Sequence, residues 1–175
     1  MPRQRHDPSK SLVGFMVGEV TYAVRIELVR EIVNPLMVVE LPHAPPSVRG
    51  VADYRGEVVP VVDLRERFGL DELARTRRNK WIVVDVSRMG NAQASSGRFV
   101  ALVVDLVTEV FGTGGQEIRP APPLGAGDRV RGIDGVTNHG DKLVFVLDVR
   151  AFGALAEATF SAMHDSIAPP PQDRP

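Results

Sequence analysis

A repeated sequence unit constrains the fold of this chain more than any other feature. The segment VRGVADYRGEVVPVVDLR, at residues 48–65, recurs in a weaker form as VRGIDGVTNHGDKLVFVLDVR at residues 130–150. Upstream of the two copies, AVRIELVREI at residues 23–32 corresponds to ALVVDLVTEV at residues 101–110. Because both pairs of segments occur in the same order, we infer that one ancestral unit was duplicated and that the two halves share one topology.

Composition limits the class of protein. A chain of 175 residues with 43% hydrophobic content can bury a substantial core, yet it is short for two independent domains. The 21 basic and 22 acidic residues give a net charge of -1, so no overall field attracts nucleic acid or an anionic membrane. Zero cysteines exclude a disulfide framework, a thiol nucleophile and a thiolate metal site, and they are typical of a cytosolic protein.

The two ends of the chain have the composition of disordered tails. Residues 1–11 are polar and lack the apolar segment of a signal peptide, and residues 168–175 are rich in proline. The longest apolar runs, such as FVALVVDLV at residues 99–107, are too short to cross a bilayer. We therefore expect no direct insertion into a membrane.

Between the tails, the periodicity is mostly that of β-strands, because valine, isoleucine, phenylalanine and tyrosine gather in short runs bounded by turn-forming residues. We predict strands at residues 12–17, 20–24, 37–40, 51–54 and 58–62, and then at 81–86, 98–103, 130–132, 133–136 and 142–147. Five short strands per half favour a mainly β fold of two pseudo-repeated, small five-stranded β-barrels. We place these two intertwined lobes at about residues 12–75 and 80–155 of a single domain, 12–157.

Glycine and proline predict the turns and one irregularity. Arg55-Gly56 and the group at residues 138–141 each lie between two strand-like runs, so both read as hairpins. Pro60 lies inside an apolar run and cannot donate to a central ladder, which favours an edge position or a bulge.

Helical spacing of apolar residues predicts short helices at residues 26–33 and 105–110. Asp63 and Asp148 end the two copies of the repeat, and we interpret both as helix caps. An amphipathic stripe near the C-terminus predicts a further helix, assigned to residues 158–167, that closes one barrel or serves a partner.

The sequence offers little catalytic machinery. The four histidines lack metal-ligand spacing, no G-x-S-x-G elbow is present, and the glycine run at residues 112–115 lacks the Lys-Ser/Thr of a phosphate loop. We expect no enzymatic activity, no cofactor and no metal. The enzymatic alternative is a small β-barrel enzyme that uses Asp63 or Asp148 with Arg55.

Small barrels can also bind nucleic acid by stacking bases on aromatic side chains in a basic groove. Aromatic residues make up only 6% of this chain, and Phe15, Trp81 and Phe99 fall in apolar strand patterns that are typical of a core. A nucleic-acid-binding barrel is therefore a less favoured alternative than the recognition of another protein.

The order of motifs resembles that of CheW, the bacterial chemotaxis coupling protein family. The resemblance covers residues 12–155 and is carried by GFMVGEVTYAVRIELVREI, LPHAPPSVRGVADYRGEVVPVVDLRERFGL, FVALVVDLVTEV, VRGIDGV and LVFVLDV. It implies two SH3-like five-stranded barrels that enclose a groove, and no catalysis. It also implies an adaptor that links transmembrane chemoreceptors to the histidine kinase CheA.

The family's receptor-contact arginine lies in an N-L-R-G turn and matches Arg55, here within D-Y-R-G. A guanidinium in a hairpin turn can grip carboxylates or helix-end carbonyls on a partner. The residues alone favour a surface arginine that pairs with Asp53 or Glu57, whereas the resemblance favours receptor contact. Tyr54 replaces the usual leucine and bears on which receptor helix is accepted.

Other positions match residues that the family associates with coupling. They are Val29 and Glu31 in V-R-E-I, Gly50 in V-R-G, and Val107 and Val110 in V-D-L-V-T-E-V. Each also has a structural interpretation, the valines as core residues and Gly50 as a turn at a strand end.

The resemblance also implies partners and a location. The expected partners are the cytoplasmic tip of a chemoreceptor and the regulatory domain of CheA, with weak self-association in arrays. The expected location is the cytoplasm, with recruitment to membrane-associated receptor arrays. Some family members serve surface motility, development or biofilm control, so a scaffold of such a pathway is the first alternative.

Overall fold

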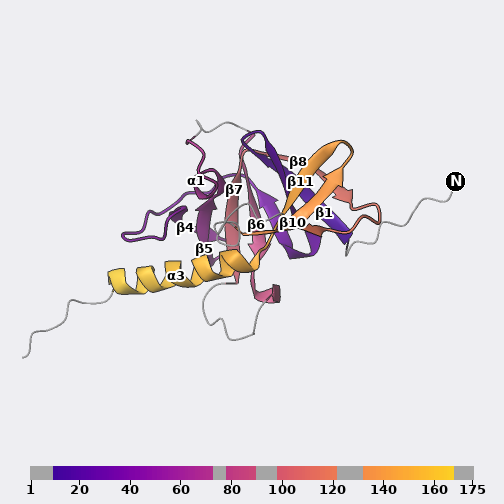
Figure 1. The fold of residues 1–175 in the computed structure, drawn as a ribbon. Coiled ribbons are helices and arrows are strands. Elements are labelled where there is room, and N and C mark those ends of the chain that lie inside the picture. Colours follow the sequence, from indigo (N-terminus) through magenta and orange to yellow (C-terminus); the bar gives the residue numbers. More distant parts are fainter. Residues whose placement is uncertain (1–9, 73–77, 90–97, 122–131, 168–175) are drawn as a thin grey trace, which may run out of the picture.

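The computed structural model describes residues 10–72, 78–89, 98–121 and 132–167 and is mainly β (Figure 1). The first sheet has the order β8 (Leu106–Gly112), β1 (Ser11–Val17), β2 (Val20–Arg25), β11 (Lys142–Leu147), β10 (Ile133–His139) and β9 (Arg119–Pro120). The second sheet has the order β3 (Val29–Val33), β6 (Lys80–Asp85), β7 (Phe99–Val104), β5 (Glu57–Asp63) and β4 (Val48–Tyr54). This two-sheet, SH3-like architecture confirms the predicted fold class.

The two halves of the chain exchange strands. The β1–β2 hairpin of the first half lies between β8 and β11 of the second half, and β2 pairs with β11 in parallel. In the same way, the β6–β7 hairpin of the second half lies between β3 and β5 of the first half. Each sheet is therefore built from both halves, and neither sheet coincides with one of the continuous stretches 12–75 and 80–155.

The hydrogen-bond pattern corrects the register of the repeat. The amide of Asp63 donates to the carbonyl of Ser47, and the amide of Asp148 donates to the carbonyl of Gly132, both at 2.8 Å. The β4–β5 ladder shifts register just before Gly50, and the β10–β11 ladder does so just before Gly135. The structural counterpart of Gly50 is therefore Gly135, three residues beyond the position that matching the two Val-Arg-Gly motifs implies.

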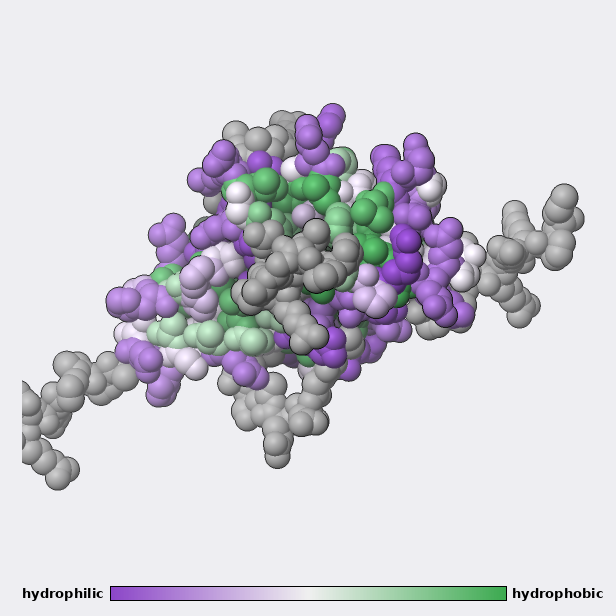
Figure 2. Space-filling view, viewed as in Figure 1, coloured by the Kyte–Doolittle hydropathy of each residue, from purple (hydrophilic) through white to green (hydrophobic). Residues whose placement is uncertain are grey.

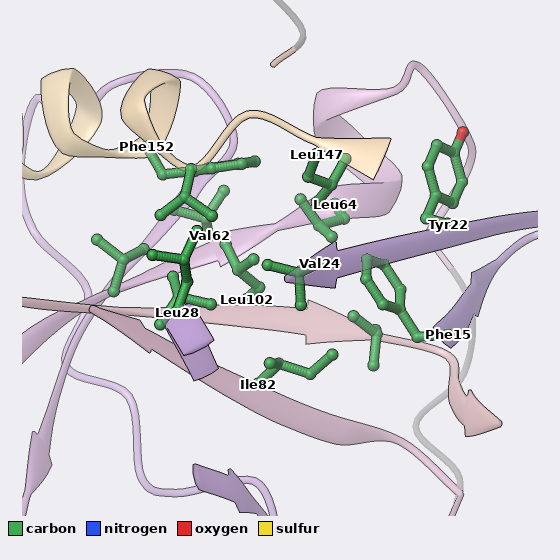
Figure 3. Close-up of a cluster of buried hydrophobic side chains, with 14 of the residues drawn as sticks. Phe15, Tyr22, Val24, Leu28, Val62, Leu64, Ile82, Leu102, Leu147 and Phe152 are labelled. Atoms are coloured by element: carbon green, nitrogen blue, oxygen red, sulfur yellow. The ribbon is translucent and has the colours of Figure 1, made fainter. Parts of the chain in front are cut away.

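Three apolar cores hold the strands together. One core is formed by the second sheet and a smaller one by the first sheet. The largest, which Figure 3 shows, lies between the sheets. Successive side chains of a strand point to opposite faces, and strand β7 uses this alternation to fill two cores. Its residues Phe99, Ala101 and Val103 point into the core of the second sheet, while Val100, Leu102 and Val104 point into the core between the sheets.

Two of the predicted helices are strands. Residues 26–33 form a 3-10 turn, η2 (Ile26–Leu28), followed by β3, and residues 105–110 lie mostly in β8. Both strands pair with a hairpin of the other half, β3 with β6 and β8 with β1. Pairing with distant strands, together with the strand preference of valine and isoleucine, outweighs the helical spacing.

The other predicted strands are confirmed within a few residues, with two exceptions. Residues 37–40 form no regular strand, and only Val39 makes a bridge, to Val51. Of the strand predicted at residues 130–132, only Gly132 is described, and it lies in a turn. The predicted terminal tails lie outside the described residues except for Lys10 and Ser11, the latter of which begins β1.

Both predicted hairpins are confirmed. Tyr54 pairs with Glu57, so Arg55 (φ 53°) and Gly56 (φ 82°) form a two-residue loop of type I′. In the second copy, His139 pairs with Lys142 across a loop that begins with Gly140 (φ 61°).

Pro60 was expected at a sheet edge or in a bulge, and it occupies neither. Strand β5 lies between β7 and β4, and Pro60 pairs with Val51 in regular register. The Val51 amide and carbonyl bond Val39 instead, at 2.9 and 2.8 Å, and the pairing of β5 with β7 begins only at Val61. The missing Pro60 amide therefore removes no ladder hydrogen bond.

Two helices follow the two copies of the repeat. The Asp63 carboxylate accepts from the amides of Arg65 and Glu66 and caps α1 (Leu64–Arg67). The Asp148 carboxylate accepts from the amide of Arg150, the first residue of α3 (Arg150–Ile167). Both capping predictions are confirmed.

Helix α3 begins well before the predicted residue 158. Its residues Phe152 and Ala156 belong to the core between the sheets, and the helix contacts β4, β5 and β7. All three strands belong to the second sheet, so the helix packs on that sheet and adds to the core between the sheets. A row of weakly apolar residues follows this helix on the surface (Figure 2). None of the helices in the described ranges is long and apolar enough to cross a membrane.

Candidate functional site

The candidate site centres on Arg55 in the turn between β4 and β5. The Arg55 side chain is 67% exposed and binds Glu31 of β3 in a bidentate ion pair. Its Nε donates to Glu31 Oε2 at 3.0 Å, and its Nη2 donates to Glu31 Oε1 at 2.9 Å. This fork matches the planar carboxylate and holds the guanidinium in one orientation at the surface.

Tyr54 holds this ion pair in place from the core. Its ring is buried in the core of the second sheet, where it packs edge-on against Phe99 at 5.9 Å. Its hydroxyl donates to Glu31 Oε2 at 2.6 Å, and the Arg55 guanidinium lies 5.8 Å from the ring centroid. The hydroxyl and the guanidinium therefore both bind one Glu31 oxygen.

The electrostatics of the three groups agree with this geometry. The hydrogen bond from Arg55, and then the one from Tyr54, hold the pKa of Glu31 below its usual value. Burial, and next the hydrogen bond to Glu31, raise the pKa of Tyr54. Hydrogen bonding to Glu31 raises the pKa of Arg55. At neutral pH the site is thus a charged pair with a neutral phenol beside it.

The same contacts close the second sheet. Strands β3 and β4 are its two edge strands, and no backbone ladder joins them in the described part of the chain. Glu31 on β3 nevertheless reaches Tyr54 at the end of β4 and Arg55 in the adjoining turn. We call these three residues the first seam, because they join the edges of a curled sheet through side chains.

The first sheet has a corresponding seam. His139 Nε2 at the end of β10 lies 3.2 Å from Glu109 Oε1 on β8, and its ring stacks on Phe111 at 4.0 Å. Strand β8 is an edge strand of the first sheet, just as β3 is an edge strand of the second. In the repeat Glu109 corresponds to Glu31 and His139 corresponds to Tyr54. We call Glu109, His139 and Phe111 the second seam.

Gly50 lies on β4, four residues before Tyr54, where the segment around Val39 crosses the strand. A Cβ at Gly50 would lie 2.1 Å from the carbonyl oxygen of Val39, and its φ is 143°. A Cβ at Gly135 would meet the carbonyl oxygen of Arg119 at 2.4 Å. Both glycines are therefore required by a close crossing of the backbone.

The three predicted valines occupy the edge strands of both sheets. Val29 on β3 packs partly against the core between the sheets, and so does its repeat counterpart Val107 on β8. Val110, also on β8, is 55% exposed. The structure therefore brings Arg55, Glu31 and Tyr54 together, while Val107 and Val110 lie on the other sheet.

The comparison with protein families decides the identity of this fold. The family model described as the CheW-like domain matches residues 11–156, which is most of the chain. The chain belongs to the CheW-like family. The membership agrees with the resemblance that the sequence motifs indicate.

Curated relatives and a solved structure agree with this membership. A chemotaxis protein CheW of Rhizobium meliloti is 34% identical over 115 residues, which cover 66% of this chain and 68% of the relative. A chemotaxis protein CheW of Treponema pallidum is 28% identical over 149 residues, which cover 85% of each chain. The crystal structure of the scaffolding protein TtCheW from Thermoanaerobacter tengcongensis matches with a TM-score of 0.67 at 27% identity, covering 79% of this chain and 88% of that one.

Within this CheW-family fold, the residues of the enzymatic alternative do not converge. Asp63 binds Arg49 and caps α1, while Asp148 binds Arg150 at 2.8 Å. Arg55 binds Glu31 at the first seam. The geometry therefore gives no support to catalysis by Asp63 or Asp148 with Arg55. No cluster of three or more possible metal ligands occurs in the ranges that the structure describes.

Sequence reasoning identified Arg55 and Glu31 separately but missed their pairing, because it looked for local partners. Asp53 instead accepts from the amide of Gly56 at 2.8 Å and stabilises the turn. The second seam was missed altogether. The correspondence of AVRIELVREI with ALVVDLVTEV already aligns Glu31 with Glu109, and this was the signal that could have found it.

Proposed function

We propose that this CheW-family chain is a non-enzymatic chemotaxis adaptor that couples transmembrane chemoreceptors to the histidine kinase CheA. The observation that carries the proposal is the exposed, bidentate Arg55–Glu31 pair, which Tyr54 holds in place at the first seam. A pre-oriented guanidinium at a surface turn is suited to protein recognition and has no reaction to perform here.

On the receptor side, Arg55 is the proposed anchor. The ion pair with Glu31 fixes the guanidinium before binding, so that less side-chain entropy is lost when a partner docks. A carboxylate or a helix-end carbonyl of the receptor tip would bind the exposed part of the guanidinium or replace Glu31. Tyr54 acts through Glu31, since its own ring is buried.

The remaining candidate residues divide by exposure. Val110 is exposed enough to touch a partner directly, whereas Val29 and Val107 are partly buried and shape the two edge strands. Gly50 is buried beneath Val39, so its proposed role is to hold the crossing segment close to the second sheet. We propose direct receptor contact for Arg55 and Glu31, direct kinase contact for Val110, and positioning roles for Tyr54, Gly50, Val29 and Val107.

On the kinase side, exposed apolar residues support two docking surfaces. Ile32 and Val58 in the second sheet are 40% and 45% exposed, and their repeat counterparts Val110 and Leu143 in the first sheet are 55% and 48% exposed. Exposed apolar residues at equivalent positions of both sheets suit a partner that contains related barrels. We propose that the regulatory domain of CheA docks on these four residues.

Signalling then follows from many weak contacts. A chain with separate receptor and kinase surfaces gains effective affinity when receptors and kinases are arrayed, because each contact raises the local concentration of the others. A change of receptor state alters its contact free energy with the adaptor and shifts the active population of the kinase. We place the chain in the cytoplasm, recruited to receptor arrays at the membrane.

The proposal can be tested by measuring two affinities separately. We would titrate this chain with a chemoreceptor signalling-tip fragment and, separately, with the CheA regulatory domain. We expect Arg55→Ala to weaken receptor binding about tenfold or more and to leave kinase binding unchanged. A Val58→Lys variant should show the reverse pattern, because it places a charge on the proposed kinase surface.

The matched control is Arg88→Ala, which removes an exposed arginine that lies away from the first seam and pairs with Asp85. It should change neither affinity. If the wild-type chain binds neither partner although all proteins are folded, the adaptor proposal is wrong. If Arg55→Ala and Arg88→Ala affect receptor binding equally, Arg55 is not the anchor.

A further inference from the structure

Residues 36–40 cross the second sheet and alternate like a strand. Leu36 and Val38 pack partly against the core of that sheet. Met37 and Val39 point outward and are 86% and 59% exposed. Val39 is held in place by its two backbone hydrogen bonds to Val51. The fold therefore explains the inward-facing residues and leaves the outward-facing apolar residues without a structural role.

The repeat supplies an internal control for these outward positions. Arg119 pairs with Val136 as Val39 pairs with Val51, so Met37 corresponds to Glu117 and Val39 corresponds to Arg119. Ile118, between the two charged residues, packs against the core of the first sheet just as Val38 packs against that of the second. In the second copy the same backbone thus presents exposed charges. The crossing tolerates polar side chains, so the apolar ones are not required by folding.

Met37 lies at the rim of a groove of about 570 Å³ between the crossing segment and the end of α1. Leu70, 39% exposed, contributes to the opposite wall, so apolar side chains line both sides. Separate areas of apolar surface among polar residues are also visible on the face shown in Figure 2.

Acidic residues line the rest of this groove. Glu40, Glu66 and Glu72 are exposed along it. Arg49 also lines the groove, but its charge is matched by the nearly buried Asp63 with which it pairs. The described residues that line the groove therefore carry a net negative charge beside its apolar walls.

We propose that this groove binds a basic amphipathic segment of a partner protein. The apolar side chains of the segment would cover Met37 and Leu70, and its lysines or arginines would lie against Glu40, Glu66 and Glu72. The negative rim repels nucleic acid and anionic lipid, so a basic protein segment is the occupant that the charges favour. Val38 and Glu40, on either side of Val39, line the groove, so its occupant also contacts the segment that Gly50 holds in place.

A pair of synthetic peptides tests the proposal. One is a helical peptide of leucine and lysine with an apolar face, and the other carries glutamate in place of each lysine. We expect the full-length chain to bind only the basic peptide by fluorescence anisotropy, with an affinity that falls as salt is added. The double variant Met37→Glu/Val39→Arg gives the first copy the outward residues of the second. It should weaken binding about tenfold or more.

The matched control is Ile167→Glu, which changes another exposed apolar residue at the far end of α3. It should bind the peptide as the wild-type chain does. Equal binding of both peptides, or equal binding by the double variant, would overturn the proposal. If the double variant loses self-association but still binds the peptide, the proposal is also wrong. The outward residues would then bind a second copy of the chain. Receptor and kinase affinities test the adaptor function separately and do not depend on this result.

Discussion

At the scale of single residues, Gly50 is constrained by the backbone before any partner is considered. Because a Cβ at this position would lie 2.1 Å from the Val39 carbonyl oxygen, the crossing segment must move if any side chain is added. We expect Gly50→Ala to lower the free energy of unfolding by about 3 kcal/mol or more. Urea denaturation measures this change.

Gly56 offers the matched control, because it also has a positive φ, 82°, but a Cβ added there would meet no atom within 4 Å. Gly56→Ala should therefore lower the free energy of unfolding by only about 1 kcal/mol, which is the cost of the left-handed backbone for a residue with a Cβ. Equal losses at the two glycines would show that the crossing does not constrain Gly50. A stable Gly50→Ala protein that fails only in coupling would assign the glycine to a partner surface.

Glu31 predicts a pH dependence that can be read from the sign of its pKa shift. Its pKa is lowered in the folded chain, so the ion pair stabilises the protein at pH values above the unfolded pKa of about 4.3. This contribution is lost as the pH falls through the folded pKa. The difference in stability between the wild-type chain and Glu31→Gln should therefore be constant near neutral pH and shrink below about pH 4.

Thermal unfolding of both proteins across this pH range checks the expectation. Arg55→Ala provides an independent comparison, because it removes the first cause of the shift. In that background, Glu31→Gln should alter the pH dependence less than it does in the wild-type chain. A difference between the wild-type and Glu31→Gln proteins that grows on acidification would contradict the ion pair.

At the scale of elements, the repeat and the apolar runs were enough to predict most strands and both hairpins. They could not predict β3 and β8, because Ile26, Val29 and Val33 also fit helical spacing. What makes these segments strands is pairing with β6 and β1, which belong to the other half of the chain. Contacts between distant segments leave no local pattern, and this also explains why the exchange of hairpins was not predicted.

The candidate site shows the same limit. Arg55, Glu31 and Tyr54 were named from the family resemblance, but only the curvature of the second sheet brings them together. The register of the repeat failed for a different reason. Ser47, with φ 67°, takes the left-handed position that Gly132 occupies in the second copy. Matching Gly50 with Gly132 because both are glycine therefore gave the wrong register.

Strand β10 carries a buried hydroxyl group that lacks a hydrogen-bond partner among the described residues. It belongs to Thr137, which is 1% exposed. Thr137→Val keeps the shape and removes the buried polar atom, so we expect it to raise the free energy of unfolding by about 1 kcal/mol.

Thr159 on α3 provides the contrast for this prediction. It is equally buried, but its hydroxyl donates to the Leu155 carbonyl at 2.7 Å. Thr159→Val removes a hydrogen bond and should not stabilise the chain. Calorimetry of the two variants compares them directly, and a loss of stability in Thr137→Val would mean that a partner for its hydroxyl exists.

At the scale of the whole molecule, the exchange of hairpins makes each half dependent on the other. The β1–β2 hairpin has its neighbours in the second half, and the β6–β7 hairpin has its neighbours in the first. Separate fragments 1–75 and 76–175 should therefore lack the dispersed amide spectrum of a folded protein. Mixed in equal amounts, they should recover the spectrum of the intact chain. A fragment that folds alone would contradict the exchange.

The central claim is that one small chain joins two partners through separate surfaces. The most direct measurement is the amount of CheA regulatory domain that co-sediments with assembled receptor fragments, with and without this chain. The account predicts that the kinase domain enters the pellet only when the chain is present, and that Arg55→Ala and Val58→Lys each abolish most of this recruitment. Recovery of the kinase domain that is unchanged by adding the chain would contradict the account.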